Sequence, residues 1–419
     1  MTPCVKYLVM VTSVNNNKYY KMIPNGNEFK VEYGRLGMPN FQTASYPISQ
    51  FKKKYDEKIR KGYVDKTELI EELVTEEKPK DKKDVEYKPI SDEVVAKIVE
   101  RLQDMARKTI EANYKVSSNM VSQKMVDESQ ECLNRLAHAT DVNDFNKILL
   151  QNFSIISRRM GHVADWLASS SKDFENIITR EQNLLDVMAG QVKQHAIDKK
   201  NAEKSNADET KEEPKSNKTI LAAMGISIKK VTKKEETEIK KLLGENASRY
   251  VNAWKVTNNK TQKAFDKYLE ELGEETEVKQ LWHGSRNENW WSIITTGLVL
   301  RPTNAIISGK MFGYGIYFAP DAAKSMGYTS QMNSCHAHGT SRTGFLSLYD
   351  VIYGDPYIVD KNYYSYNGLG QLTYESLQKI KPGANSLHAL KGVTGLLRDE
   401  IIVYKESQAT IKYLVEVEA

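Results

Sequence analysis

The sequence predicts a multidomain α+β protein, in which a small β-rich region, an all-α bundle and a larger α+β region follow one another. Apolar residues alternate with polar ones in the first third, recur at three- and four-residue steps in the middle, and gather in strand-like runs in the last third. The length of 419 residues suggests two to four domains. We expect domains at 1–74, 89–198 and 219–419, joined by linkers at 75–88 and 199–218.

The first region is expected to contain a hairpin and a helix. Strands are predicted at Tyr19–Met22 and Phe29–Tyr33, on either side of the turn signal Pro24-Asn25-Gly26-Asn27. A helix is predicted from Ser49 to Lys61.

The middle region is expected to form a bundle of several helices. Ser91, followed by Asp92 and Glu93, is typical of a helix N-cap with acidic residues in the first turn. Apolar residues then recur with the spacing of amphipathic helices: Val95, Ile98, Val99, Leu102, Met105, Ala106, Cys132, Leu133, Leu136, Ile155, Ile156, Leu184 and Leu185.

In the last region, helices are predicted near 233–243 and 261–272, and strands at 344–354, 400–405 and 410–418. Helices and strands are segregated along the chain, which favours an α+β fold over a doubly wound sheet. The two linkers are rich in charge and poor in apolar residues, so we expect them to be mobile. A solvated helix face remains the alternative for the first half of each linker.

Composition excludes several classes of protein. No run of about 18 apolar residues is present and the N-terminus lacks an apolar signal segment, so we expect an intracellular protein without membrane association. The odd number of distant cysteines (Cys4, Cys132 and Cys335) argues against a disulfide framework. His336 and His338 flank Cys335 closely, but a plain loop is favoured there over a metal site, and no metal is expected.

Three segments of the last region carry candidate catalytic residues. They are Leu281-Trp282-His283-Gly284-Ser285-Arg286, Met311 to Ala319 with Tyr317, and Asp399 to Tyr404 with Glu400. This pattern resembles the His-Tyr-Glu signature of the poly(ADP-ribose) polymerases, which cleave NAD+ and move its ADP-ribose to an acceptor. The resemblance implies an ADP-ribosyltransferase fold for 219–419, with NAD+ as the donor substrate.

The resemblance also implies roles for single residues. His283 would bond the ribose hydroxyls, Gly284 and Ser325 the nicotinamide amide, and Tyr317 and Tyr328 would flank the nicotinamide ring. Glu400 would stabilise the positive charge that grows on the ribose. Taken singly, each aromatic residue is more often part of a core, and a lone Glu at a strand end usually faces solvent.

Further positions match the family with less specificity. Ser285, Arg286 and Asn289 would lie towards the adenosine end and Met311 on the acceptor side. Lys324 would lie near Glu400 and is a further candidate catalytic residue. The motif Gly313-Tyr314-Gly315 lacks the third glycine and the strand–turn–helix setting of a dinucleotide fingerprint.

A Glu at the third position of the signature is typical of members that build polymers, so Glu400 favours polymer formation. Arg398 departs from the family, whose close members tend to carry an aromatic residue there. This departure leaves chain length and branching open.

The first region resembles the WGR domain, which binds DNA ends in the family. The motif appears here as Tyr33-Gly34-Arg35, and Tyr33 and Arg35 would take part in DNA binding. Lys52, Lys53 and Lys54 are candidates for phosphate contacts, with a solvated helix face as an equally weighted alternative. The mild net charge of +5 allows contact with nucleic acid without establishing it.

The middle region resembles the helical regulatory domain of DNA-dependent members. Asn183-Leu184-Leu185-Asp186 resembles a helix near the adenosine pocket, so Asp186 is a candidate NAD+ contact. The resemblance implies that this domain blocks NAD+ until damaged DNA binds. A helical spacer is the alternative.

The sequence therefore predicts a monomeric, DNA-break-stimulated poly(ADP-ribose) polymerase that modifies proteins, including itself. Three alternatives stay open: transfer of a single ADP-ribose, modification of nucleic-acid ends, and an inactive DNA-binding scaffold. We expect the nucleus as its location in a eukaryote, and the cytoplasm beside the chromosome in a bacterium.

Overall fold

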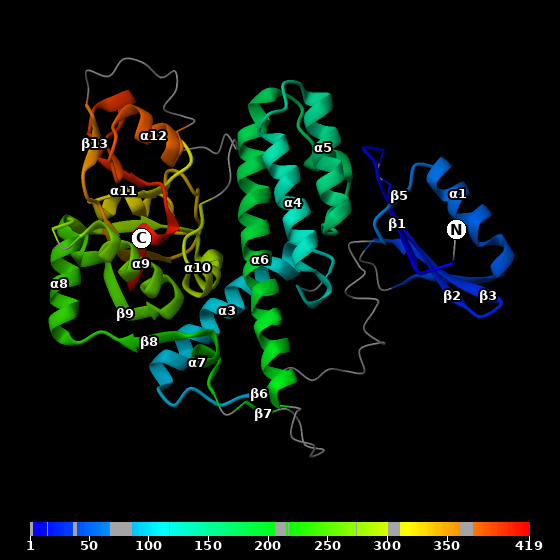
Figure 1. The fold of residues 1–419 in the computed structure, drawn as a ribbon, viewed down its shortest axis with the longest axis horizontal. Helices are drawn as coiled ribbons and strands as arrows, with labels where there is room; N and C mark the ends of the chain where they lie inside the picture. Colours follow the sequence, from blue (N-terminus) through cyan, green and yellow to red (C-terminus); the bar gives the residue numbers. More distant parts are fainter. Residues whose placement is uncertain are drawn as a thin grey trace. The chain divides into compact units, whose positions relative to one another are not determined.

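The computed structural model describes residues 3–14, 16–36, 40–67, 86–116, 118–205, 215–216, 218–273, 275–300, 311–360 and 372–419. These residues form two compact units, shown as ribbons in Figure 1. The N-terminal unit holds the described residues up to 67 together with 107–196. The C-terminal unit holds residues 86–106 and the described residues from 197 to 419.

A five-stranded antiparallel sheet opens the N-terminal unit. Its order is β4-β3-β2-β1-β5, formed by β1 (Lys6–Val11), β2 (Asn17–Asn25), β3 (Glu28–Arg35), β4 (Gln42–Pro47) and β5 (Val64–Asp65). The 3₁₀ turn η1 (Ile48–Gln50) leads into α1 (Phe51–Arg60), where the Phe51 ring meets Phe29 edge-on, with 5.1 Å between ring centres. Gly26 takes the left-handed conformation (φ 60°) in the turn between β2 and β3. The predicted hairpin and helix are confirmed.

Helices dominate the described part of residues 86–205. They are α3 (Glu93–Asn113), α4 (Gln123–Leu136), α5 (Val142–Ile155) and α6 (Phe174–Ser205), with 3₁₀ turns η2 (Ser118–Met120), η3 (Val163–Trp166) and η4 (Ser171–Asp173). Gln130 of α4 donates to Gln182 of α6 at 2.8 Å, and the Phe145 ring of α5 stacks on Phe174 of α6. The predicted bundle is confirmed, and none of the described helices is long and apolar enough to cross a membrane.

The N-cap of α3 differs from the predicted one. Asp92, and not Ser91, accepts hydrogen bonds from the amides of Val94 and Val95, at 2.9 and 3.1 Å. These amides belong to the second and third residues after Asp92, which are the two that a cap side chain reaches.

Parts of the predicted linkers have secondary structure, and a helix at the start of 199–218 agrees with the alternative kept open for that half. The helix α6 continues to Ser205, because Lys, Ala and Glu in this stretch are good helix formers. The short strand β6 (Glu86–Tyr87) pairs in parallel with β7 (Lys215–Ser216). Residues 68–85 and 206–214 lie outside the described residues.

Besides the pair of β6 and β7, two larger sheets build the C-terminal unit. The larger has the order β10-β12-β16-β9-β8, and the smaller β11-β15-β14-β13. All neighbours in these two sheets are antiparallel except β13 and β14, which confirms the α+β class. The strands are β8 (Ile226–Lys230), β9 (Tyr250–Asn258), β10 (Val278–Gly284), β11 (Ile316–Phe318), β12 (Thr343–Ile352), β13 (Pro356–Val359), β14 (Ser386–Ala389), β15 (Glu400–Val403) and β16 (Ala409–Glu418).

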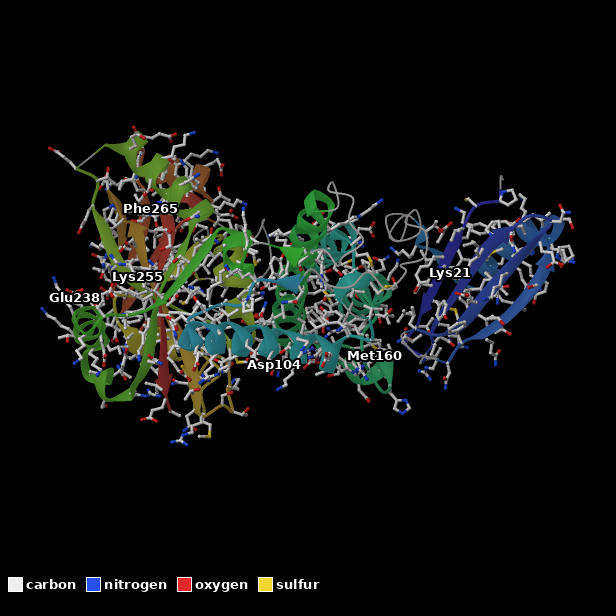
Figure 2. The ribbon with its side chains drawn as sticks, turned by 90° about the horizontal axis from the view of Figure 1, so that it is seen from below. Lys21, Asp104, Met160, Glu238, Lys255 and Phe265 are labelled. Atoms are coloured by element: carbon white, nitrogen blue, oxygen red, sulfur yellow. The ribbon has the colours of Figure 1, made fainter. Side chains whose placement is uncertain are left out.

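Helices of the C-terminal unit cover these sheets. Phe265 and Tyr268 of α9 pack on Ile352 of β12, and Figure 2 labels Phe265 together with Lys255 on β9 and Glu238 on α8. The helices are α7 (Ile220–Met224), α8 (Lys233–Leu243), α9 (Asn259–Leu272), α10 (Trp290–Thr296), α11 (Ala322–Met326) and α12 (Tyr374–Ile380), with 3₁₀ turns η5 (Gly244–Arg249), η6 (Asn287–Asn289), η8 (Val393–Gly395) and η9 (Glu406–Gln408).

The helix α3 contributes to both units. Within the C-terminal unit, Arg101 of α3 pairs with the buried Glu416 at 2.7 Å and donates to Thr343 Oγ1 at 2.9 Å. Its guanidinium also lies 5.0 Å from the centre of the Phe345 ring. Residues 86–106 therefore group with the last third of the chain, whereas the sequence assigned 89–198 to one domain. The predicted domain boundaries stay predictions.

Candidate active site

Strand ends and a short helix bring the predicted residues together in the C-terminal unit. β10 ends in His283-Gly284, and just before it Trp282 exchanges two backbone hydrogen bonds with Ala319, at 2.8 and 2.9 Å. The antiparallel register of β11 and β15 pairs Phe318 with Ile401, so Ala319 comes opposite Glu400. The backbone thus joins the His-bearing strand and the Glu-bearing strand through β11.

The hydrogen bond of His283 fixes its tautomer. Nδ1 lies 2.9 Å from the carbonyl oxygen of Tyr317, which can only accept, so Nδ1 carries the proton. Burial lowers the pKa of His283 below its ordinary value, with a smaller opposing effect from this bond. The imidazole is therefore neutral near pH 7, and Nε2 is a hydrogen-bond acceptor suited to a hydroxyl.

Gly284 allows close backbone approach. A Cβ atom at residue 284 would lie 1.9 Å from the carbonyl oxygen of Ser325, a contact that no side chain tolerates. Ser325 lies on α11 and is 4% exposed. The backbones of Gly284 and of the buried Ser325 are thus held in close contact.

Tyr317 is anchored through its hydroxyl. The hydroxyl donates to Gly313 O at 2.9 Å and accepts from Phe312 N at 3.0 Å. Burial raises the pKa of Tyr317 well above its ordinary value, so the hydroxyl stays protonated. The ring is consequently a fixed wall, and it is not an acid or base of the site.

Glu400 and Lys324 form a buried ion pair. Glu400 Oε1 lies 2.7 Å from Lys324 Nζ, with the side chains 7% and 13% exposed. Lys324 Nζ also donates to Arg398 O at 3.3 Å. Burial raises the pKa of Glu400, and the bond to Lys324 opposes that rise. Glu400 Oε2 is buried and has no hydrogen-bond partner among the described residues.

Tyr328 follows α11 and is half-buried. Its ring stacks on His336, with 4.4 Å between ring centres and 21° between planes. Burial is the main cause that raises the pKa of Tyr328, followed by the charge of Glu400. Tyr328 therefore lies within electrostatic reach of the ion pair.

Ser285, Arg286 and Asn289 line the turn after β10. Asn289 Nδ2 donates to Ser285 Oγ at 3.1 Å, and Arg286 Nη2 donates to Ala337 O at 2.9 Å. Asn289 Oδ1, like Asn287 Oδ1 in the same turn, is a buried acceptor without a partner in the described part of the chain. Unpaired buried acceptors at Glu400 and Asn289 suit the hydroxyl donors of a sugar, so these residues fit NAD+.

Met311 is half-buried and packs beside Phe312 on the smaller sheet. Residues 301–310 lie outside the described residues. Among the described residues, no group of three or more His, Cys, Asp or Glu side chains is arranged to hold a metal ion.

Sequence reasoning missed Asp321, and it missed the contacts that Arg398 makes beside the ion pair. Asp321 caps α11 by accepting from Ala323 N at 2.8 Å, and it also pairs with Arg398. Arg398 in turn holds Lys324 through its carbonyl oxygen. The cap was detectable, because an Asp directly before Ala-Ala-Lys-Ser is a helix-start signal.

The predicted DNA-binding residues lie in the N-terminal unit. Tyr33 is half-buried and its ring lies 5.8 Å from Tyr20, whereas Arg35 is exposed at the end of β3. On α1, Lys52 pairs with Asp56 at 3.1 Å and Lys54 with Glu57 at 3.8 Å, while Lys53 is exposed.

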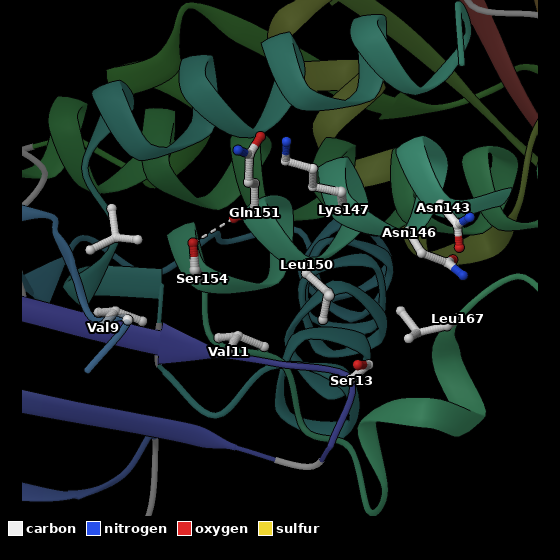
Figure 3. Close-up of a pocket in the computed structure, with 12 residues that line it drawn as sticks. Val9, Val11, Ser13, Asn143, Asn146, Lys147, Leu150, Gln151, Ser154 and Leu167 are labelled. Carbon is white, nitrogen blue, oxygen red and sulfur yellow. Dashed lines mark hydrogen bonds between the residues drawn. The ribbon is translucent and has the colours of Figure 1, made fainter. Parts of the chain in front are cut away.

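The sheet and the bundle of the N-terminal unit also meet. Burial lowers the pKa of Lys115, and the charges of Arg35 and Arg159 lower it further. Arg35 of the sheet therefore forms a cationic cluster with Lys115 and Arg159 of the bundle. A cavity of about 410 Å³ between β1 and α5 is lined by residues such as Val11 and Leu150 (Figure 3).

Asp186 lies on α6 in the N-terminal unit, where Gln182 Nε2 donates to its Oδ1 at 3.1 Å. The structure does not bring it into the same compact unit as His283 and Glu400. Its predicted contact with NAD+ stays a prediction.

Two protein-family models match the chain. The model of the poly(ADP-ribose) polymerase catalytic domain matches residues 226–419, which include all of the site in the C-terminal unit. The WGR domain model matches residues 5–69, which include Tyr33 and the α1 lysines.

Similar proteins carry names of the same family. A protein of Invertebrate iridescent virus 6, named putative poly [ADP-ribose] polymerase-like 100L, is 32% identical over 189 residues, which are 44% of this chain and 97% of that protein. Poly [ADP-ribose] polymerase 2 of Homo sapiens is 34% identical over 157 residues, covering 33% of this chain and 26% of that protein. Poly [ADP-ribose] polymerase 1 of Danio rerio is 32% identical over 152 residues, covering 33% of this chain and 14% of that protein. The match thus covers nearly the whole length of the viral protein, but 26% and 14% of the length of the two animal proteins.

Proposed function

Since this chain belongs to the poly(ADP-ribose) polymerase family and is an NAD+ ADP-ribosyltransferase, we propose that it builds ADP-ribose polymers in response to DNA breaks. The observation that carries the proposal is the buried pair of Glu400 and Lys324, with one carboxylate oxygen bound to the amine and the other unpaired. Acceptors would be protein side chains, including its own, and then the hydroxyls of the growing chain.

Binding of the nicotinamide end falls to Gly284 and its neighbours. The Gly284 backbone and the Ser325 hydroxyl bond the carboxamide, and the close approach of the two backbones, which needs glycine at 284, supports this assignment. Tyr328 and Tyr317 flank the flat ring. His283 accepts a hydrogen bond from a ribose hydroxyl at Nε2, because Nδ1 is committed to Tyr317 O.

Glu400 acts on the charge that develops in the reaction. When the bond between nicotinamide and ribose breaks, its electron pair leaves with nicotinamide and positive charge grows on the ribose. The carboxylate stabilises this charge in a dry site, where electrostatic interactions are strong. Its unpaired Oε2 also suits an acceptor hydroxyl, from which it takes the proton as the new glycosidic bond forms.

Two observations support control by DNA. The WGR match and the cationic cluster of Arg35, Lys115 and Arg159 favour a phosphate-binding surface in the N-terminal unit. The helix α3 runs through both units and its Arg101 is fixed to Glu416. An element with residues in two units can couple a binding event in one unit to the other.

One experiment tests this proposal. The full chain is incubated with labelled NAD+, with and without nicked duplex DNA, beside Glu400→Gln and the control Glu271→Gln, whose residue is exposed on α9. We expect a high-molecular-weight smear only with DNA for the wild type and control, and single additions or nothing for Glu400→Gln. Equal labelling without DNA would refute the control by DNA. Absence of labelling under every condition would refute ADP-ribosyl transfer by this chain.

A further inference from the structure

The segment Gln331–Ser341, between α11 and β12, is an ordered wall of the candidate site. Met332 N donates to Ser341 O and Ser341 N donates to Ser330 O, at 2.9 and 2.8 Å. Two isolated parallel bridges hold the segment on itself. Its shape is therefore specified by backbone pairing, although its sequence resembles a plain loop.

The backbone of this wall adopts conformations that only specific surroundings maintain. Asn333 and His338 both adopt the left-handed conformation, at φ 65° and 47°. Such a conformation is uncommon for residues other than glycine and persists where the surroundings over-determine it. A Cβ atom at Gly339 would lie 2.2 Å from the backbone of Ser330, so this turn accepts only glycine without rearrangement.

The wall is tied to the rest of the site from two sides. Arg286, in the turn after His283-Gly284, donates to Ala337 O at 2.9 Å. The buried Gln331 donates to Val417 O at 2.7 Å and accepts from Arg249 at 3.3 Å. The segment is thus anchored both to the predicted adenosine side and to the larger sheet.

His336 projects from this wall onto Tyr328. The amides of His336 and Ala337 both donate to Gly327 O, at 2.9 and 3.1 Å, which holds the segment against the residue before Tyr328. A Cβ atom at Gly327 would lie 2.7 Å from Cys335 Sγ and 3.2 Å from His336 Cδ2, so glycine is needed for this approach. The two rings are nearly parallel, at 4.4 Å between their centres.

We propose that His336 is a positioning residue for the transfer reaction, and that it covers one face of the Tyr328 ring so that the nicotinamide ring stacks on the other. This inference rests on the proposed function. A tyrosine ring held by a second ring has fewer orientations to lose when the substrate binds, which lowers the entropic cost of binding. Burial, Lys324 and His338 keep the imidazole neutral near pH 7, because they all lower the pKa of His336.

His336 should affect the binding of the nicotinamide end of NAD+ and not the binding of the ADP-ribose part. His336→Ala is expected to raise the KM for NAD+ about fivefold, which is the size of effect typical of a stacked aromatic pair. Inhibition by nicotinamide should weaken by the same factor, whereas inhibition by ADP-ribose, which lacks the ring, should not change. His336→Phe keeps a flat ring at the same place and should restore both constants.

The matched control is His138→Asn, which alters an exposed histidine of the N-terminal unit, outside the candidate site. It should leave all three constants unchanged. Unchanged constants for His336→Ala in an active enzyme would overturn this inference alone. A lowered KM would also overturn it, because the imidazole would then occupy the nicotinamide face. Absence of NAD+ consumption by the wild type would overturn the proposed function, and this inference with it.

Discussion

Two ion pairs of this protein each join a lysine to a carboxylate, but one is buried and the other is exposed. They are Lys324–Glu400 and Lys52–Asp56. The first is 2.7 Å long with side chains 13% and 7% exposed, and the second is 3.1 Å long with side chains 68% and 44% exposed. An exposed pair contributes at most about 1 kcal/mol, whereas a buried charge without its partner costs several kcal/mol. The residue types of the two pairs are alike, so they do not separate an active site from a solvent-exposed helix face. The burial of the side chains does separate them.

A large effect is expected from Gly284→Ala, which disturbs the site without touching a charge. The new Cβ would meet Ser325 O at 1.9 Å, so the backbone around Ser325 must shift. A misplacement of about 1 Å near reacting groups lowers rates about 100-fold. NAD+ turnover should fall by that factor.

The control for that change is Gly161→Ala, where nothing lies within 4 Å of the added Cβ. It should leave turnover as in the wild type. Equal turnover for wild type and Gly284→Ala would contradict the assignment of Gly284 to the nicotinamide subsite.

The next effect is a shift in pH dependence. Glu400 acts as a carboxylate, so activity is present above its pKa in the folded protein and is lost as the pH falls through it. Burial has raised this pKa, and Lys324 holds it down. Lys324→Gln should therefore move the acid limb of the pH–rate profile to higher pH, and rates measured from pH 5 to 8 would show it.

The matching change on the surface is Lys240→Gln, which breaks the partly exposed pair with Glu236. This variant should keep the acid limb of the wild type. If both variants shifted the limb alike, the protonation that controls the rate would not belong to Glu400.

A smaller effect is expected for DNA binding. Arg35→Ala should weaken binding to nicked duplex DNA for every sequence alike and reduce the salt slope of log Kd by about 1, which is the signature of one lost phosphate contact. Fluorescence anisotropy across a salt series measures both quantities. An unchanged slope would remove Arg35 from the DNA interface.

The smallest effect is expected for Lys52→Ala. Because its pair with Asp56 lies in solvent, the free energy of unfolding should change by less than about 0.5 kcal/mol in urea denaturation. A loss of 2 kcal/mol would contradict the contrast drawn between the two ion pairs.

Much of the fold was predictable because local signals and the final elements agree. The turn at Pro24-Asn25-Gly26-Asn27, the helix 233–243 and the strand 410–418 each carry a strong pattern, and each is present in the structure. The end of α6 was predicted only as an alternative, since residues 199–205 have good helix propensity but no apolar face that would mark their packing.

The candidate site was predictable in its residue types and not in its contacts. His283, Tyr317 and Glu400 follow from motifs, whereas the bond from His283 to Tyr317 O depends on the meeting of two strands 34 residues apart. The pair of Asp321 and Arg398 and the stack of His336 on Tyr328 join segments that carry no common pattern. Such contacts are set by tertiary packing, which a single sequence does not display.

The most direct test of the central claim compares NAD+ binding and NAD+ turnover in Glu400→Gln. The amide keeps the shape of Glu400 and removes its charge, so binding in the ground state should stay within a few-fold of the wild type. The turnover number should fall by about 100-fold or more, since the lost interaction belongs to the transition state. A turnover number equal to that of the wild type would contradict the account.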